Sequence, residues 1–299
     1  SEFHEAACSV AGLLQSLGAA GKTVLLVYPS GLDFVAAFFG CLMAGVIAVP
    51  CSSPRPGQGS ERIAAICADA KPVFCLTTSL LRERIEKNLS VPLYPVEVGS
   101  TPEQEFRPER VDPSSIALLQ YTSGSIAAPK GVMVTHANIM ANQEMIRRNF
   151  GHRLGEAIVA GWLPLFHDMG LIGNVMQPVY TGSSMRLMAP ETFIMRPLRW
   201  LKLLSETRAY TSGGPNFAYD LCVKRIPEEK CEGLDLSSWK VAYNGSEPVR
   251  AATMRRFAEK FARFGFVPKA FHPCYGLAET TLIVSGKPAG SEPRTLRVD

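Results

Sequence analysis

The stretch Tyr121-Thr122-Ser123-Gly124-Ser125-Ile126-Ala127-Ala128-Pro129-Lys130-Gly131 joins two short apolar runs, residues 116–119 and 132–134. The first run is typical of a buried strand. Because hydroxyls and small residues fill the loop, several backbone N–H groups can turn towards one anion without obstruction. Lys130 adds a point charge. This composition favours a loop that holds a polyphosphate.

The loop is not a Walker A motif, Gly-x-x-x-x-Gly-Lys-Ser/Thr. Pro129 stands where that motif has its second glycine, and Gly131 stands where it has its Mg²⁺-binding hydroxyl. The simpler alternative is a polar turn between two strands, because hydroxyl-rich turns are common. The loop by itself leaves these two interpretations open.

Composition narrows the class of protein. The chain has 299 residues, of which 46% are hydrophobic and 19% charged, typical of a globular protein with a sizeable core. The net charge of +4 is scattered, so we expect no nucleic-acid surface. Eight cysteines without a CxxC pair indicate reduced thiols and a cytoplasmic location. The apolar stretch 34–49 is shorter than the ~20 residues of a membrane span, so none is expected.

The hydrophobic pattern alternates between strand and helix, which predicts an α/β fold of doubly wound, mostly parallel sheets with flanking helices. In such sheets, ligands bind beyond the carboxyl ends of the strands. Strands are predicted at residues 23–28, 46–49, 72–76, 116–119, 132–134, 157–162, 184–188 and 239–243. Helices are predicted at residues 5–20, 33–44, 61–70, 80–88, 136–150, 169–179, 197–207, 216–225 and 248–264.

A second motif places His167 and Asp168 at a predicted strand-to-helix junction among aromatic residues. His167 can face a carboxylate substrate. Alternatively, Asp168 caps the next helix and His167 is only exposed, which is the favoured interpretation of the motif taken alone.

A third motif pairs Gly213 with Gly214, so that the backbone can approach a ligand closely. The nearby Phe217 can wall an apolar tunnel. An aromatic residue at helical spacing is more often part of the core.

Two further motifs follow predicted strands. Asn244-Gly245-Ser246-Glu247-Pro248 can pair with a purine edge, or it is an ordinary turn between a strand and a helix. In Tyr275-Gly276-Leu277-Ala278-Glu279-Thr280, a carboxylate beside a hydroxyl can hold Mg²⁺, and the aromatic ring can stack on a base. Taken alone, a solvated glutamate is the favoured interpretation of Glu279.

Together and in this order, the motifs resemble the adenylate-forming superfamily, whose members join a carboxylate to AMP. The resemblance covers nearly the whole chain, although those enzymes usually have Thr-Gly at Ile126-Ala127. It is closest to fatty acyl-AMP ligases, through the stretches LPLFHDMGLIG, SGGPNFAYDLC, LDLSSWKVAYNGSEPVR and YGLAETTLIVSG.

The resemblance implies that ATP activates a fatty acid to an acyl adenylate and that pyrophosphate leaves. The acyl group would then pass to the phosphopantetheine of an acyl carrier protein or of a polyketide or peptide synthase module. Mg²⁺ would neutralise the developing charge. Catalysis would consist mostly of positioning and electrostatics.

The resemblance also assigns roles to matching residues. The cofactor-binding set is Thr122, Ser123, Gly124, Ser125, Lys130, Asn244, Gly245, Ser246, Glu247, Tyr275, Gly276 and Thr280. The catalytic set is His167, Lys130 and Glu279, with Glu279 as the metal ligand. The substrate set is His167, Asp168, Gly213, Gly214 and Phe217.

By the same analogy, residues 1–111 form a first α/β block, and residues 112–299 form a second that holds the ATP and acyl sites. We expect the chain to be a truncated portion of a longer protein that lacks the mobile C-terminal domain. Residues 286–299 resemble the beginning of an insertion typical of fatty acyl-AMP ligases. The chain alone is therefore expected to bind ligand but to be poorly active.

Three alternatives remain. An acyl-CoA synthetase would share the fold but use free coenzyme A as the acceptor. A non-catalytic ligand-binding module would agree with the altered Ile126-Ala127. A Ser-His-Asp hydrolase is disfavoured because the sequence has no Gly-x-Ser-x-Gly elbow.

Overall fold

The structure is a computed structural model that describes residues 2–54, 61–100, 104–108, 110–121 and 129–296. The chain forms two compact units. The first unit is Ser1–Ile139 with Leu165–His167, and the second is Met140–Pro164 with Asp168–Asp299. The chain therefore passes from one unit to the other between residues 139 and 140, 164 and 165, and 167 and 168. A domain boundary between residues 111 and 112 stays a prediction.

The first unit contains a six-stranded sheet in the order β4-β3-β1-β2-β5-β6. Its first five strands run parallel, and β6 pairs antiparallel with β5. The strands are β1 (Thr23–Tyr28), β2 (Ile47–Ser52), β3 (Phe74–Thr77), β4 (Leu93–Pro95), β5 (Ile116–Tyr121) and β6 (Gly131–Thr135).

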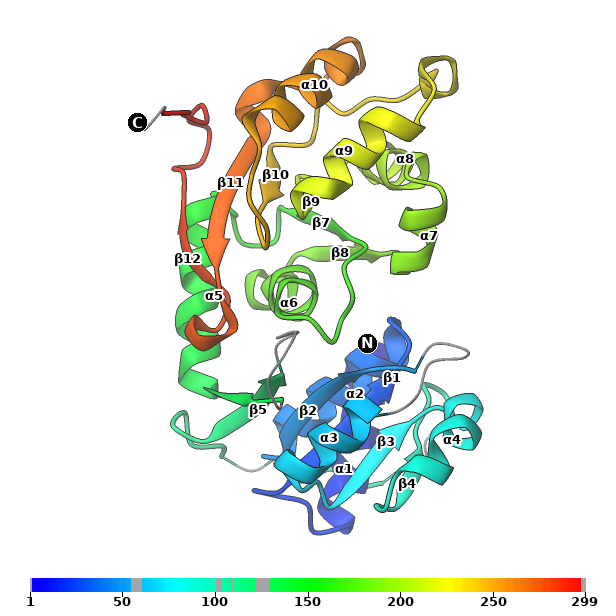
Figure 1. The fold of residues 1–299 in the computed structure, drawn as a ribbon. Helices are drawn as coiled ribbons and strands as arrows, with labels where there is room; N and C mark the ends of the chain where they lie inside the picture. Colours follow the sequence, from blue (N-terminus) through cyan, green and yellow to red (C-terminus); the bar gives the residue numbers. More distant parts are fainter. Residues whose placement is uncertain (1, 55–60, 101–103, 109, 122–128, 297–299) are drawn as a thin grey trace. The chain divides into compact units, whose positions relative to one another are not determined.

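Helices cover both faces of this sheet, and β1 is therefore buried on both sides. Leu25 and Val27 pack in one core cluster with Ile63 and Ile66, and the ring of Tyr28 contacts Phe34 on the other face. These residues come from the strand and from the helices on either side of it (Figure 1). The helices are α1 (Glu2–Ser16), α2 (Leu32–Met43), α3 (Glu61–Ala70), α4 (Ser79–Ile85) and η1 (Glu86–Asn88).

The second unit contains another six-stranded sheet, in the order β12-β11-β10-β9-β7-β8. Five strands run parallel, and β12 pairs antiparallel with β11 at one edge. The strands are β7 (Ile158–Gly161), β8 (Ser184–Leu187), β9 (Thr211–Gly214), β10 (Val241–Asn244), β11 (Phe271–Gly276) and β12 (Ile283–Gly286).

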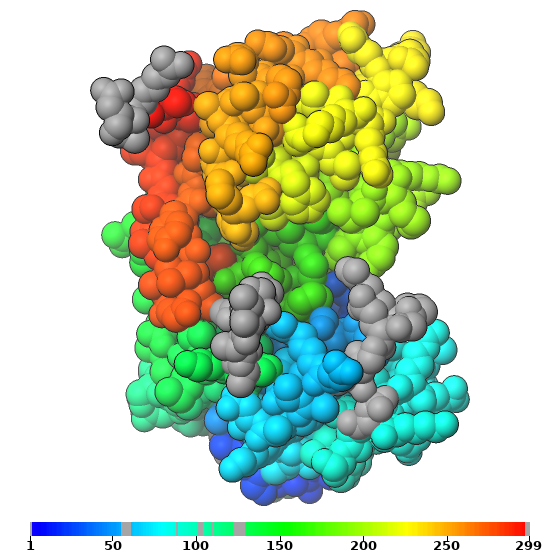
Figure 2. Space-filling view, viewed as in Figure 1, coloured from blue at the N-terminus to red at the C-terminus, as the bar shows by residue number. Residues whose placement is uncertain are grey.

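This sheet is also covered on both faces. On one face, Tyr219 and Phe257 pack with Trp239 in an aromatic core. On the other, Phe150 stacks on Tyr243 of β10. The helical elements are α5 (His136–Phe150), η2 (Met169–Met176), α6 (Gln177–Thr181), α7 (Pro190–Met195), α8 (Leu198–Thr207), α9 (Asn216–Arg225), η3 (Glu228–Cys231), α10 (Ala251–Phe261), η4 (Ala262–Phe264), η5 (Pro268–Ala270) and η6 (Ala278–Thr280). Residues of α7 and α9 form part of the yellow and yellow-green surface on the right of Figure 2.

The predicted α/β fold of mostly parallel sheets is confirmed. Strand 23–28 and helices 61–70, 136–150 and 216–225 have the predicted bounds. The eight cysteines form no disulfides with one another in the structure, and Cys8, Cys67 and Cys274 are only half-buried, whereas the sequence predicted mostly buried thiols.

Three predicted helices differ from the structure. Helix 5–20 lies at Glu2–Ser16 instead, and Gly18, with a φ of 61°, follows its end. Residues 169–179 form no single α-helix, because a π-helical segment, η2, precedes α6, whose first turn contains Pro178. Proline has no N–H for a regular helical hydrogen bond, which agrees with a break near this position. Helix 248–264 begins only at Ala251, because Ser246 adopts a φ of 65° and residues 245–250 have no regular helical structure. No helix in the described part of the chain is long and apolar enough to cross a membrane.

Candidate functional site

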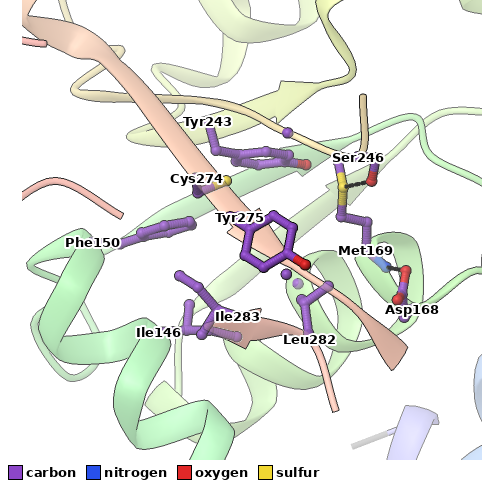
Figure 3. Close-up of a pocket in the computed structure, with 13 residues that line it drawn as sticks. Ile146, Phe150, Asp168, Met169, Tyr243, Ser246, Cys274, Tyr275, Leu282 and Ile283 are labelled. Carbon is purple, nitrogen blue, oxygen red and sulfur yellow. Dashed lines mark hydrogen bonds between the residues drawn. The ribbon is translucent and has the colours of Figure 1, made fainter. Parts of the chain in front are cut away.

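A pocket in the second unit lies among α5, η2, β10, β11 and the turn into β12 (Figure 3). The space in it that is open to the centre of a water molecule is about 50 Å³, and the space between atoms is about 520 Å³ when open solvent at its mouth is included. Strand β10 ends at Asn244, beside the pocket, as expected for a ligand site at the carboxyl end of a parallel strand. The lining residues are Ile146, Phe150, Asp168, Met169, Gly173, Tyr243, Gly245, Ser246, Cys274, Tyr275, Gly276, Leu282 and Ile283.

One end of the pocket is polar. Asp168, Met169 and Ser246 lie together there in Figure 3. The Asp168 carboxylate accepts a hydrogen bond of 2.6 Å from the Met169 N–H, and Asp168 is the N-cap of η2. The capping interpretation of Asp168 is thus confirmed, and the same residue also lines the pocket. The Ser246 hydroxyl donates to the Met169 sulfur.

The opposite end is apolar. Phe150 and Ile146 lie there in Figure 3, and they are one turn apart on α5. The ring of Phe150 stacks on Tyr243, with centroids 6.0 Å apart and planes at 13°. The Tyr243 hydroxyl points out of this apolar end and donates to Asn174 Oδ1 at 2.8 Å, while burial raises the pKa of the phenol. The pocket therefore combines a polar mouth with an apolar interior.

Tyr275 also lines the pocket, and because 61% of the residue is exposed to solvent it lies at the mouth. Gly245 and Gly276 line the same pocket. A flat, exposed ring beside backbone that carries no side chain can stack on a planar ligand such as a nucleic-acid base. The residues present therefore fit an adenine group.

The turn between β11 and β12 is held tightly. Leu277 donates its N–H to the Leu282 carbonyl at 3.0 Å, and a Cβ atom on Gly276 would lie only 1.9 Å from that oxygen. Glycine is therefore required at this close approach. The turn presents Glu279 and Thr280 to solvent.

Asn142 of α5 anchors the same turn. Its Nδ2 donates to the carbonyl oxygens of Thr280 and Ile283, at 3.1 and 3.0 Å. Its Oδ1 accepts from the Ile283 N–H at 3.1 Å. The sequence interpretation missed Asn142, Ile146 and Phe150. Their spacing of four residues on a predicted helix was the available signal, because it puts them on one face.

Other predicted residues lie near the pocket without lining it. Asn244 is fully buried at the end of β10; its Nδ2 donates to Asn216 Oδ1 at 3.5 Å, and its Oδ1 has no partner within the described residues. Glu247 accepts a hydrogen bond of 2.5 Å from the Phe217 N–H at the start of α9. A carboxylate is favourable at a helix N-terminus.

Three residues of the predicted substrate set do not line this pocket, namely Gly213, Gly214 and Phe217. A Cβ atom on Gly213 would lie 2.1 Å from the Tyr243 carbonyl oxygen, and one on Gly214 would lie 2.7 Å from the Trp162 ring. Both glycines thus serve close packing within β9. Phe217 is 42% exposed and contacts Trp162 edge-on. A substrate role for these residues stays a prediction.

Lys130 and His167, which were also predicted as site residues, are not part of the unit that contains the pocket. Lys130 is exposed and His167 is half-buried, and both are part of the first unit. Residues 122–125 of the predicted phosphate loop lie outside the described residues. Within the described part of the chain, no three His, Cys, Asp or Glu side chains form a metal-binding cluster. A lone exposed Glu279 is still compatible with Mg²⁺, which is usually held by one or two carboxylates together with substrate phosphates.

Comparison with known proteins places these observations in a family. The family described as AMP-binding enzyme matches residues 1–297. The chain belongs to the AMP-binding enzyme family. The exposed ring of Tyr275 beside Gly245 agrees with an adenylate ligand in a member of this family.

Individual relatives support the resemblance to fatty acyl-AMP ligases. The medium-chain-fatty-acid–acyl-carrier-protein ligase JamA of Moorena producens is 39% identical, over 99% of this chain and 52% of its own length. A long-chain-fatty-acid–AMP ligase of Mycobacterium marinum is 40% identical, over 100% of this chain and 53% of its own.

A solved structure shows the same fold. The fatty acyl-adenylate ligase of L. pneumophila, in complex with acyl adenylate and pyrophosphate, superposes with a TM-score of 0.89 at 43% identity. The match covers 97% of this chain and 52% of that one. The predicted resemblance to fatty acyl-AMP ligases is confirmed, and this AMP-binding chain spans about half the length of the relatives it matches.

Proposed function

We propose that this AMP-binding protein activates a fatty acid to an acyl adenylate with release of pyrophosphate, for transfer to the phosphopantetheine of a carrier protein. One observation carries the proposal. A single pocket joins an apolar end at Phe150 and Ile146 to a mouth with the exposed ring of Tyr275. An acyl adenylate has the same two halves, an apolar chain and a purine nucleotide.

The apolar end supports binding of the fatty acid chain. Phe150, Ile146 and Ile283 are each at most 8% exposed, so a chain inserted between them leaves water almost completely. Each buried methylene contributes about 0.8 kcal/mol. The pocket thus favours a long apolar acid over a short polar one. The carboxylate of the acid would lie nearer the polar mouth.

The mouth supports binding of the nucleotide. Tyr275 would stack on the adenine, and Gly245 and Ser246 would line its other side. Asn244 and Glu247 would support this strand end from behind, through their bonds to Asn216 and Phe217. These assignments account for the exposed aromatic ring beside side-chain-free backbone.

The loop of residues 121–131 would hold the phosphates of ATP. Thr122, Ser123, Ser125 and Lys130 would hold the β- and γ-phosphates while a carboxylate oxygen of the acid attacks the α-phosphorus. The new acyl–phosphate bond replaces the bond to pyrophosphate, which leaves. Glu279 would hold Mg²⁺, which supplies charge neutralisation when bound, and Thr280 would face the α-phosphate.

His167 would mark the entrance for the acyl chain, and the acceptor would be a carrier protein. JamA, whose name states that it ligates medium-chain fatty acids to an acyl carrier protein, supports this acceptor. The alternative acceptor is free coenzyme A. The chain of 299 residues alone would bind ligand but turn over poorly, because its relatives use about twice this length.

The test uses the full-length gene product with Mg²⁺, ATP and a labelled medium-chain fatty acid, with and without coenzyme A. We expect acyl-AMP to accumulate and acyl-CoA to be absent in both. Accumulation of acyl-CoA would assign the protein to the conventional synthetases instead.

A second measurement separates catalysis from ligand binding alone. Lys130→Ala should weaken ATP binding about tenfold or more, because a charged hydrogen bond is worth about 1.5–3 kcal/mol. AMP affinity should change little. The exposed Lys22→Ala is the matched control. An unchanged ATP affinity in Lys130→Ala, without acyl-AMP formation by the unaltered protein, would favour a non-catalytic module.

A further inference from the structure

Phe150 lies at the apolar end of the pocket, together with Ile146. Phe150 is the last residue of α5 and lies one helical turn beyond Ile146, at the end of the pocket farthest from Asp168 and Ser246 (Figure 3). Its ring is packed from three sides, with centroids 4.7 Å from His272, 5.6 Å from His152 and 6.0 Å from Tyr243. Only 8% of Phe150 is exposed, and its ring packs against His152 and His272, which do not line the pocket.

The groups behind this wall are polar. His152 lies 2.7 Å from the Thr211 hydroxyl and 3.2 Å from the Gln177 amide nitrogen. Gln177 is fully buried, and its Oε1 has no partner within the described residues. His272 lies 2.6 Å from Asn149 Oδ1. An alkyl chain that displaced Phe150 would therefore meet these buried polar groups, and contact with them is unfavourable for hydrocarbon.

The backbone at Phe150 is fixed. Gly151 follows with a φ of 66°, its N–H donates to the Arg148 carbonyl at 3.3 Å, and the His152 N–H donates to the Arg147 carbonyl at 2.9 Å. These two bonds form a Schellman cap, which ends the helix at a defined residue.

Side chains on the same helix turn add rigidity. Glu144 accepts hydrogen bonds from Arg147, Arg148 and the Tyr180 hydroxyl, at 2.6 to 3.0 Å. Bonds from α5 to α6 thus hold the end of α5 in place. Phe150 cannot withdraw from the pocket by a small rotation of the helix without breaking these bonds.

We propose that Phe150 is the residue that limits the length of the acyl chain, and that Ile146 narrows the pocket one turn before it. This inference rests on the proposed fatty acid adenylation, and it adds the residue that decides which chains are accepted. A chain that reaches Phe150 fills the pocket, whereas one more methylene must displace the ring. In an apolar pocket, such a misfit lowers kcat/KM about 10-fold or more.

The experiment measures acyl-AMP formation by the full-length gene product with saturated fatty acids of increasing length. In Phe150→Leu, the longest accepted chain should become longer, and kcat/KM for the first chain that the unaltered protein rejects should rise about 10-fold or more. In Ile146→Phe, the limit should become shorter. Phe257→Leu, a fully buried phenylalanine on the opposite face of the sheet, is the control and should leave the limit unchanged.

Thermal unfolding by circular dichroism identifies the variants that fold. If Phe150→Leu folds and adenylates short chains normally but keeps the original limit, the inference is wrong while the proposed function holds. If the unaltered protein forms no acyl-AMP from any chain, the proposed function fails and this inference fails with it. A shift in Phe257→Leu as large as in Phe150→Leu would also overturn the assignment, because general loosening of the core would then explain both.

Discussion

Asn142 and Ile283 share two reciprocal hydrogen bonds: the asparagine Nδ2 donates to the Ile283 carbonyl, and its Oδ1 accepts from the Ile283 N–H. These residues are far apart in sequence, on α5 and at the start of β12. A third bond reaches the Thr280 carbonyl. One buried amide therefore holds the turn that presents Glu279, the predicted metal ligand.

Asn142→Ala should reduce adenylation and stability together. The substitution leaves the Ile283 N–H and two carbonyl oxygens without their side-chain partner, which costs about 1–3 kcal/mol for buried groups. We expect the rate of pyrophosphate exchange to fall more than the unfolding free energy alone explains, because the turn loosens. Urea unfolding and exchange rates measured on the same preparation check this. Asn149→Ala, on the same helix but bonded to Lys287 and His272, should leave exchange nearly normal.

Tyr275→Ala should weaken nucleotide binding. Loss of a base–aromatic stack costs about 1–3 kcal/mol, or roughly 5- to 150-fold in affinity. Tyr275→Phe keeps the ring and should bind normally. Because 61% of the residue is exposed, stability should hardly change. Calorimetric titration with AMP is the measurement, and equal affinities of the alanine and phenylalanine variants would remove Tyr275 from the adenine site.

Gly276→Ala should destabilise the fold locally. The added methyl would lie 1.9 Å from the Leu282 carbonyl oxygen, so the turn must move. Overpacking of this kind costs about 1–3 kcal/mol. Gly31→Ala is a suitable control, because nothing lies within 4 Å of the position that its Cβ atom would take and its φ of −179° is open to any residue. Chemical denaturation should separate the two variants clearly, and equal stability would contradict the close approach.

Stability should fall as the solution is acidified from about pH 6.5 to pH 4. Burial lowers the pKa of His152 to about 4, and burial, with smaller contributions from Lys287 and His152, lowers that of His272 to about 4. An unfolded histidine has a pKa of about 6.5. In this window, the unfolded chain binds protons that the folded chain does not, so each histidine costs up to about 3 kcal/mol at the acid end. The carboxyls of Glu144, Asp220 and Asp235, whose pKa values are lowered by hydrogen bonds and ion pairs, add to the loss of stability in the acid part of this window and below it.

The measurement is the unfolding free energy by urea at several pH values. His152→Gln removes one titrating group and should flatten the slope between pH 6.5 and 4. Thr211→Val removes the hydroxyl next to His152 but keeps the imidazole, so it should retain the slope even if it is less stable. An unchanged slope in His152→Gln would show that this imidazole is not the group that titrates.

The sequence by itself determined the class of fold and the order of the motifs. The run of residues 23–28 predicted a strand that the structure has with the same bounds, because a continuous apolar run records burial on both faces. The motif of Tyr275 and Gly276 pointed to a ligand site, and both residues line the pocket. These features are local, so neighbouring residues carry the information.

Only the tertiary structure showed that Ile146 and Phe150 line the apolar end of the pocket and that Asn142 holds the turn before β12. Asn142, Ile146 and Phe150 lie on one face of α5, but the sequence does not say that this face meets the turn at Thr280–Ile283 and the ring of Tyr243. The order of strands in the sheet brings these segments together. Pairing between distant strands depends on packing across the whole unit and leaves no local pattern. Residues that act at such contacts therefore become visible only once the chain is folded.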